Sequence, residues 1–218
     1  DSNVLLAKTE KYVFGAEEKP SVEILLSSYG KDKIKSGAVQ YSLRSDELDI
    51  KGSVEFTSSD ARLTSVGTFV PDFSGITKPQ KAVLTLTMGE LHNSYVFWLY
   101  PQTNVEITEN GIKTADDELI FADSVEKAKV LIASGKKAMV ITDGSNAIEN
   151  AYCADFWNYH MFRVISESMN KPVAPGTMGL LIDKNDKLLS AFPCEKFTTP
   201  QWYEAVTHSK ADILDDTP

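Results

Sequence analysis

The hydrophobic period of this chain changes once, near Pro101, and the change restricts the folds that the chain can adopt. Before Pro101, apolar and polar residues alternate with a period of two, as in residues 82–88. This is the pattern of half-buried β-strands. After Pro101, apolar residues also recur at helical spacing. We therefore expect two modules in series, over residues 1–103 and 104–218.

The first module contains about seven short segments typical of strands, separated by residues that favour turns. The segments are residues 12–14, 22–26, 38–43, 50–56, 62–69, 82–88 and 95–100. No segment among them has helical periodicity. The pattern predicts an antiparallel, immunoglobulin-like β-sandwich.

The second module begins with a predicted strand at 118–122, a helix and a strand at 137–142. Asp123 and Glu126 resemble a capping box, and Gly135 is placed to end the helix. A further helix is expected at 158–169 and a third parallel strand at 178–183. A last helix is expected from Thr199 as cap, with Pro200 first.

These elements predict a small three-layer α/β module of the flavodoxin or amidotransferase type. Three parallel strands make a small sheet for this architecture, so we expect the module to continue in a longer parent chain.

The charge and the length of the apolar runs exclude some partners. The formal net charge is −9. Nucleic acids and anionic membranes bind basic surfaces, so neither is expected as a partner. The sequence contains no apolar run long enough for a transmembrane helix.

Sequence motifs of cofactor, metal and catalytic sites are missing from the chain. There is no phosphate-binding loop, no dinucleotide fingerprint and no histidine or cysteine pair at metal-ligand spacing. No catalytic residue, cofactor or metal is therefore predicted. Ser145 follows a predicted strand without the glycines of a nucleophile elbow. Cys153 and His160 are seven residues apart, but a buried structural role is the preferred interpretation of Cys153.

Aromatic residues cluster in two segments of the second module, residues 152–163 and 197–203. Such side chains stack on sugars, fill cores or anchor interfaces. The candidate carbohydrate-binding residues are Trp157, Asn158, Tyr159 and Trp202. In the helix at 158–169, Phe162, Ile165 and Met169 are expected to turn inward together.

Trp98 and Tyr100 share one face of the strand at 95–100. They are predicted to lie in the sandwich core or at the seam between the two modules.

Several motifs, taken together in their order, resemble a known family. They are Asn-Ser-Tyr-Val-Phe-Trp-Leu-Tyr-Pro at 93–101, Phe-Trp-Asn-Tyr-His-Met-Phe-Arg at 156–163 and Gly-Thr-Met-Gly-Leu-Leu-Ile-Asp at 176–183, followed by Phe-Pro at 192–193 and Thr-Pro-Gln-Trp-Tyr at 199–203. The set is similar to the downstream region of large multidomain glycoside hydrolases of family 2, β-galactosidase-like proteins of gut Bacteroidetes. There an immunoglobulin-like sandwich precedes a glutamine-amidotransferase-like module.

The resemblance implies a secreted or periplasmic parent protein that degrades polysaccharides. It also implies that the catalytic glutamates lie on a barrel domain of the parent chain, because 218 residues cannot hold a (β/α)₈ barrel besides these modules. No catalytic residue carries over to this sequence.

Four functional hypotheses remain open. The first is a non-catalytic accessory segment that packs against the catalytic barrel of its parent. The second is a carbohydrate-binding module with aromatic platforms for an oligosaccharide. The third is a small hydrolase of amidotransferase-like fold that uses Cys153 or Ser145. The fourth is an interaction surface, which would show as an exposed apolar patch.

Overall fold

The computed structural model describes residues 3–30, 33–57, 62–142, 164–165, 167–170, 180–189, 192–203 and 205. Contacts divide the chain into two units. The first joins Asp1–Gln102 to Ile182–Gln201, and the second joins Thr103–Leu181 to Trp202–Pro218. We call Ile182–Gln201 the returning segment. The sequence predicted a single boundary at residue 103 and did not indicate that residues 182–201 belong to the first unit.

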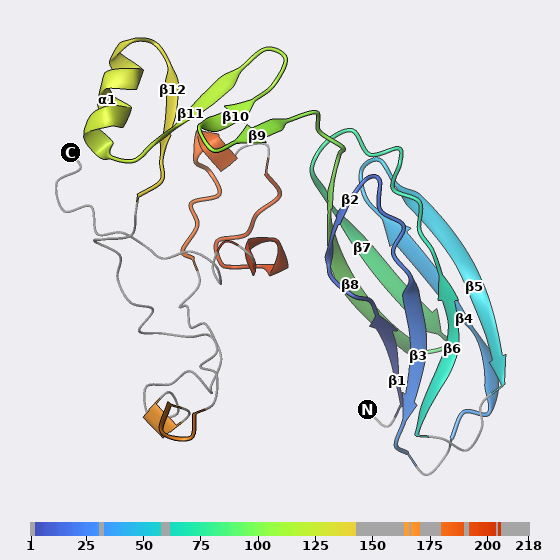
Figure 1. Cartoon of the computed structure of the whole chain (residues 1–218). Helices are drawn as coiled ribbons and strands as arrows, with labels where there is room; N and C mark the ends of the chain where they lie inside the picture. Colours follow the sequence, from blue (N-terminus) through green and yellow to red (C-terminus); the bar gives the residue numbers. More distant parts are fainter. Residues whose placement is uncertain are drawn as a thin grey trace. The chain divides into compact units, whose positions relative to one another are not determined.

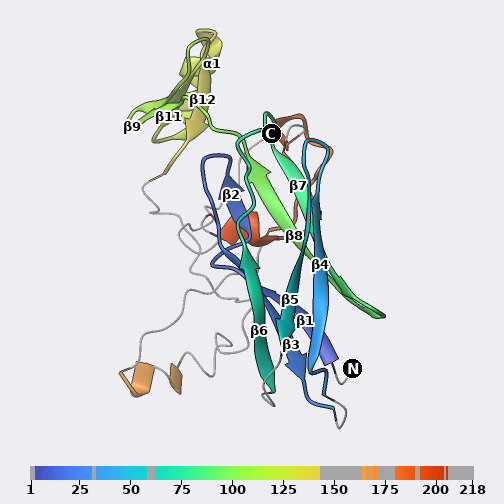
Figure 2. The same cartoon turned by 90° about the vertical axis from the view of Figure 1, so that its right-hand side faces the viewer.

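The first unit contains eight strands in its described residues. They are β1 (Asn3–Lys8), β2 (Val13–Gly15), β3 (Val22–Ser28), β4 (Ser36–Arg44), β5 (Asp49–Thr57), β6 (Leu63–Phe69), β7 (Gln80–Met88) and β8 (Leu91–Tyr100). They form a three-stranded sheet of order β1-β3-β6 and a five-stranded sheet of order β2-β8-β7-β4-β5. Every pair is antiparallel except β2 with β8. The predicted β-rich fold of this part is confirmed (Figure 1, Figure 2).

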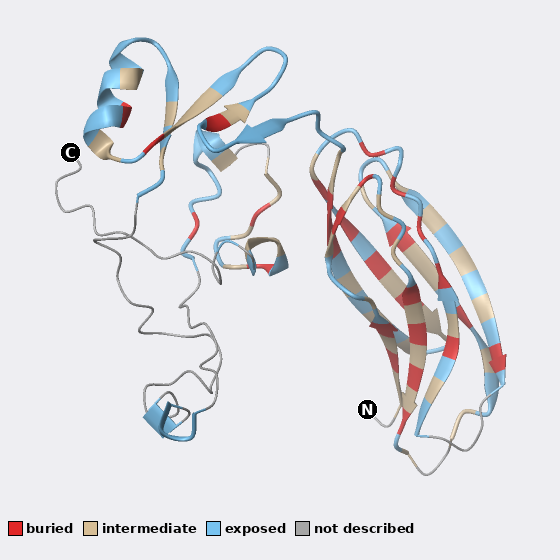
Figure 3. Ribbon diagram, viewed as in Figure 1, coloured by how far each residue is buried: buried red, intermediate tan, exposed pale blue. Residues whose placement is uncertain are grey.

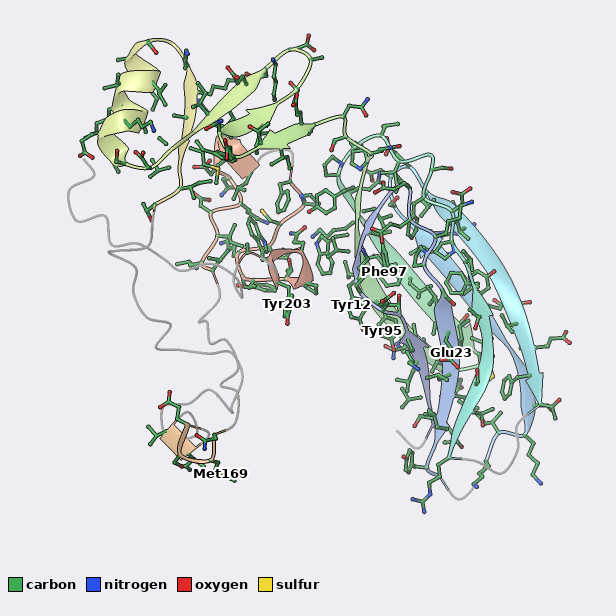
Figure 4. All side chains as sticks on the ribbon, viewed as in Figure 1. Tyr12, Glu23, Tyr95, Phe97, Met169 and Tyr203 are labelled. Carbon is green, nitrogen blue, oxygen red and sulfur yellow. The ribbon has the colours of Figure 1, made fainter. Side chains whose placement is uncertain are left out.

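One hydrophobic core lies between the two sheets. In β3 every second residue is buried, from Val22 to Ser28, because successive side chains of a strand point to opposite faces. Figure 3 shows the buried residues as bands across the strands. Tyr12 and Phe97, labelled in Figure 4, have ring centroids 6.1 Å apart. The largest fully buried side chains are Phe14, Phe73, Phe97, Leu5, Ile24, Leu26, Leu43, Leu84, Leu86, Leu99, Val22 and Val39.

The β7–β8 hairpin turns through Gly89 and Glu90, between the paired residues Met88 and Leu91. Gly89 has a φ of 57°. Glycine adopts this left-handed backbone without steric cost, and a two-residue hairpin with glycine first is a favoured connection. The sequence Met-Gly-Glu-Leu-His-Asn at 88–93 favours a hairpin connection, and the structure has one there.

The turn between β4 and β5 is tied to the loop before β7 by Glu47. Its carboxylate accepts hydrogen bonds from the Thr77 backbone N–H at 3.0 Å, from the Thr77 hydroxyl and from the Gln80 amide. The donation from the Thr77 side chain, followed by that from its backbone, lowers the pKa of Glu47 to about 2. The ionised carboxylate therefore holds the turn at neutral pH.

Between residues 103 and 142, the second unit contains a four-stranded sheet of order β12-β11-β10-β9 and the helix α1. Its elements are β9 (Glu106–Thr108), β10 (Gly111–Lys113), β11 (Glu118–Ala122), α1 (Val125–Ala133) and β12 (Lys137–Val140). β11 and β12 are parallel and are joined by α1, as the sequence predicts.

The start of α1 differs from the expected cap. Ser124, not Asp123, is the N-cap residue, and its hydroxyl accepts from the Lys127 backbone N–H at 3.4 Å. Asp123 instead forms an ion pair with Lys127 at 3.1 Å. The end of the helix is as predicted: Gly135 has a φ of 82°, and its N–H donates to the Ile132 carbonyl at 2.9 Å.

The described residues do not form the expected three-layer α/β module. The hairpin of β9 and β10 was not predicted, because strands of three residues are too short to show a period. Of the expected strand at 178–183, residues 180–183 are described, and Leu181 is an isolated bridge. The Asp183 and Asp186 carboxylates accept from the backbone N–H groups of Asn185 and Leu188 at 3.0 and 2.7 Å. These local hydrogen bonds compete with strand pairing.

The later helices are described in part. Residues 164, 165, 167 and 168 are helical, in agreement with the prediction. Ile165 and Met169 are 44% and 57% exposed, so they are not turned into a core (Figure 4). Helical periodicity shows which face could be buried, but not whether a partner covers it. Pro200 opens a 3-10 turn, Pro200–Trp202. The Thr199 hydroxyl is buried without a hydrogen-bond partner among the described residues, so it does not act as the expected cap.

Candidate functional site on the outer face of the five-stranded sheet

The outer face of the five-stranded sheet carries the side chains that alternate with the core residues. Phe97 and Leu99 of β8 belong to the core, so Trp98 and Tyr100 point to the opposite face. The strand register places Lys81 of β7 beside Trp98. Further along the face, the same rule brings side chains of β4, β5 and β7 together. The two ends of this face have different surroundings.

Residues 192–201 of the returning segment cover one end. Trp98 is 6% exposed although it does not face the core. The Tyr100 ring lies 5.7 Å from the Phe192 ring, centroid to centroid. The Tyr100 hydroxyl donates to the Gln201 side-chain oxygen at 2.6 Å, and the Gln201 amide donates to the Pro193 carbonyl at 3.1 Å. We call this region, Lys81, Trp98 and Tyr100 beneath residues 192–201, the covered end.

An ion pair between Lys81 and Glu195 adds to the covered end. The hydrogen bond from Lys81, with its positive charge, lowers the pKa of Glu195. Both side chains remain about one-third exposed, at 37% and 35%. The pair links the returning segment to β7 and adds little to the stability of the fold, because ion pairs in contact with solvent are weak.

Burial raises the pKa of Tyr100 above its usual range, and the nearby Cys194 thiol raises it further. The phenol therefore stays protonated and continues to donate to Gln201. Cys194 itself is buried, with a free thiol. The Trp98 indole N–H is also buried and has no hydrogen-bond partner among the described residues. The covered end is thus mainly a packed contact with one well-made hydrogen bond.

The other end of the face is a groove of about 620 Å³. It is lined by Gln40, Tyr41, Ser42, Arg44, Lys51, Gly52, Ser53, Val83, Thr85 and Thr87. We call it the open groove. Tyr41 and Gly52 pair across β4 and β5, and the Tyr41 ring stacks on Phe69 of the other sheet at 4.1 Å. A side chain on Gly52 would strike the Tyr41 hydroxyl.

Charged side chains occupy one side of the open groove. Asp49 accepts from Arg44 Nε at 3.1 Å and from Lys51 Nζ at 2.9 Å. The hydrogen bond from Lys51, followed by that from Arg44, lowers the pKa of Asp49. Between Arg44 and Lys51 lies Ser42, whose hydroxyl is buried without a hydrogen-bond partner among the described residues. The groove therefore presents hydroxyls, an amide and two cations to solvent.

The predicted site residues are only partly described. Trp157, Asn158 and Tyr159 lie outside the described residues, as do Ser145, Cys153 and His160. Trp202 is half-buried at the end of its 3-10 turn. Sequence reasoning missed the open groove, because a polar residue at every second position is the ordinary pattern of a solvated sheet face.

Among the residues that the structure describes, no helix is long and apolar enough to cross a membrane. The same residues contain no group of three or more histidine, cysteine, aspartate or glutamate side chains placed to hold a metal ion.

Two family models match the chain, one on each side of residues 102–118. Residues 18–101 match a family described as Domain of unknown function (DUF8488). Residues 119–218 match a family described as Domain of unknown function (DUF8487). No curated protein matches the chain.

Among solved structures, a β-glucosidase from Listeria innocua in complex with glucose is 13% identical, with a TM-score of 0.34 over 45% of this chain and 16% of that chain. A novel β-glucosidase from Erythrobacter marinus is 16% identical, with a TM-score of 0.35 over 45% of this chain and 15% of that chain. The matched region thus spans about a sixth of the length of these enzymes. Similarities this low carry no conclusion about the activity of this chain.

Proposed function

We propose that this chain is a non-catalytic accessory segment of a multidomain protein that degrades glycans. In this role the sandwich is an immunoglobulin-like spacer, and the rest of the chain packs against or extends a catalytic domain of the same parent. The sheet order β1-β3-β6 and β2-β8-β7-β4-β5 supports an immunoglobulin-like assignment, because each sheet also pairs strands that are not consecutive in sequence, such as β3 with β6 and β4 with β7.

The observation that carries the proposal is the covered end. A spacer has to hold its neighbours in a fixed arrangement, and a flexible tether cannot do this. Here a segment about eighty residues downstream of β8 packs on the Tyr100 ring and accepts hydrogen bonds from Lys81 and Tyr100. The chain therefore leaves the sandwich and is anchored on it again, which supports a structural role for this unit.

The glycan part of the proposal rests on the motif set at 93–101, 156–163, 176–183 and 199–203, which resembles glycoside hydrolases of family 2. On this basis the partner is the catalytic barrel of the parent chain, and the parent is secreted or periplasmic.

An activity assay and the complete reading frame test the proposal together. The isolated chain is incubated with a panel of aryl β-glycosides, and release of the phenol is compared with a protein-free blank. We expect no release above the blank and a reading frame that encodes a catalytic barrel. Hydrolysis that a single carboxylate substitution abolishes would contradict the accessory role, and so would a reading frame without a catalytic domain.

A further inference from the structure

We propose that the open groove binds a saccharide that carries a carboxylate group. The inference deepens the proposed function, and it rests on that function for the choice of a glycan among ligands rich in hydroxyl groups. It uses residues of the sandwich and none of the aromatic residues of the second unit.

The floor of the open groove is a grid of short polar side chains. The register places Ser53, Gln40 and Thr87 side by side in one row across β5, β4 and β7. The next row holds Lys51, Ser42 and Thr85. Neighbouring strands are about 4.8 Å apart, a spacing close to the length of one pyranose unit. A sugar chain that crosses the strands therefore meets a hydroxyl, an amide or an ammonium group at each step.

Hydroxyl side chains match the chemistry of a sugar, because each can donate and accept, as sugar hydroxyls do. The Ser42 hydroxyl lacks a hydrogen-bond partner among the described residues. It is buried in the floor, although buried polar groups in proteins are nearly always paired. Rotation of the Ser42 side chain about its Cα–Cβ bond would turn the hydroxyl towards the groove, where a ligand hydroxyl would supply the partner.

The cations determine the charge of the ligand. Asp49 accepts a single hydrogen bond from Arg44 and a single one from Lys51. A guanidinium has five N–H donors and an ammonium three, so donors exceed acceptors at this end of the groove. A carboxylate is the acceptor that pairs best with a guanidinium, through two parallel hydrogen bonds. The volume of about 620 Å³ is in the range of ligand sites and suits a short oligosaccharide.

Isothermal titration calorimetry of the whole chain tests the inference with two tetrasaccharides of the same backbone, tetragalacturonate and neutral galactotetraose. We expect the acidic sugar to bind about tenfold more tightly than the neutral one. Added salt should lower the affinity for the acidic sugar and leave that for the neutral sugar unchanged.

Two arginine variants localise the binding. Arg44→Gln should remove the preference for the acidic sugar. The matched control, Arg62→Gln, removes the same charge from a site where the guanidinium lies 5.6 Å from the Tyr29 ring, and it should bind as the unchanged chain does. Thr85→Val removes a groove hydroxyl with little change in size and should weaken both sugars. Circular dichroism confirms that each variant is folded, and Lys51→Gln replaces Arg44→Gln if that variant does not fold.

Equal affinities for the two sugars, or equal effects of the two arginine variants, would overturn the assignment of an acidic saccharide. A folded chain that binds neither sugar would overturn the groove as a glycan site and leave the accessory role standing. Hydrolysis of aryl glycosides, by contrast, would overturn the accessory role and leave the groove standing.

Discussion

The covered end and the open groove lie on the same face of one sheet, yet they differ in chemistry and in what they meet. At the covered end the outward aromatic side chains are Trp98, which is buried, and Tyr100, and residues 192–201 contact Tyr100 and the neighbouring Lys81. At the open groove they are serine, threonine, glutamine, arginine and lysine together with Val83, and the groove is open to solvent. The difference shows that an outward position does not decide burial. The side chain there must also offer apolar area, and a partner segment must reach it.

The largest expected effect is that of Trp98→Ala. If the covered end is packed as the contacts indicate, this substitution removes a buried indole and should lower the free energy of unfolding by about 3–5 kcal/mol. At the open groove, Ser42→Ala should change it by no more than about 0.5 kcal/mol. Urea denaturation of both variants measures the contrast. Similar effects of the two substitutions would abolish the distinction between the two ends.

The hydrogen bond between Tyr100 and Gln201 gives the next effect. Tyr100→Phe should cost about 1 kcal/mol of unfolding free energy, since the ring stays and the hydroxyl is lost. In a double-mutant cycle with Gln201→Ala, the two changes should be less than additive. Strictly additive effects would show that the two side chains do not interact, and the anchoring of the returning segment would then need another explanation.

The pH dependence of the free energy of unfolding tests the role of Glu47. Its carboxylate links the turn between β4 and β5 to Gln80, the first residue of β7. Its pKa is about 2 in the folded chain, against an ordinary value of 4.5. A lowered pKa means that the contribution to stability is complete above about pH 4.5 and is lost as the pH falls through about 2.

In the Glu47→Gln variant, the free energy of unfolding should therefore fall less as the pH is lowered through this range. Urea midpoints at several pH values measure this. Glu90→Gln, in the exposed β7–β8 turn, is the matched control and should keep the slope of the unchanged chain. A slope that both substitutions alter equally would argue against a specific role for Glu47.

The smallest effect is expected from the ion pair of Lys81 and Glu195. A double-mutant cycle with Lys81→Ala and Glu195→Ala should give a weak coupling that fades as salt is added, because both side chains are partly exposed. A coupling that persists in high salt would indicate a pair more deeply buried than the structure has it, and the covered end would then resemble a charged interface more than an apolar one.

Much of the first unit could be predicted from the sequence, because its cause is local. Alternation in residues 82–88 and 95–100 places β7 and β8, and Gly89 marks their hairpin. In the second unit, Gly135 marks the end of α1 in the same way. The return of residues 182–201 could not be predicted in this way. It depends on contacts between residues about one hundred positions apart, such as Tyr100 with Gln201, and no local pattern reports them.

The candidate site shows the same limit. Trp98 and Tyr100 were predicted to lie in the sandwich core or at the seam between the two modules because they share a strand face, but residues 192–201 were not identified as their neighbours. The open groove gave no signal, since Ser42 and Thr85 resemble any solvated strand residues until the register brings them side by side. In the returning segment, the Asp183 and Asp186 carboxylates accept hydrogen bonds from the backbone where the sequence predicted the end of a strand, and these local bonds favour turns.

The most direct test of the central claim, that the returning segment is part of the sandwich unit, is the rate at which a thiol reagent labels Cys194. A Cys153→Ser variant of the whole chain leaves Cys194 as the sole thiol. Cys194 is buried in the returning segment, so labelling should proceed only through the global unfolding that exposes the sandwich core, with the same dependence on urea. Labelling at the rate of a free thiol, under conditions in which circular dichroism shows the sandwich folded, would contradict the claim.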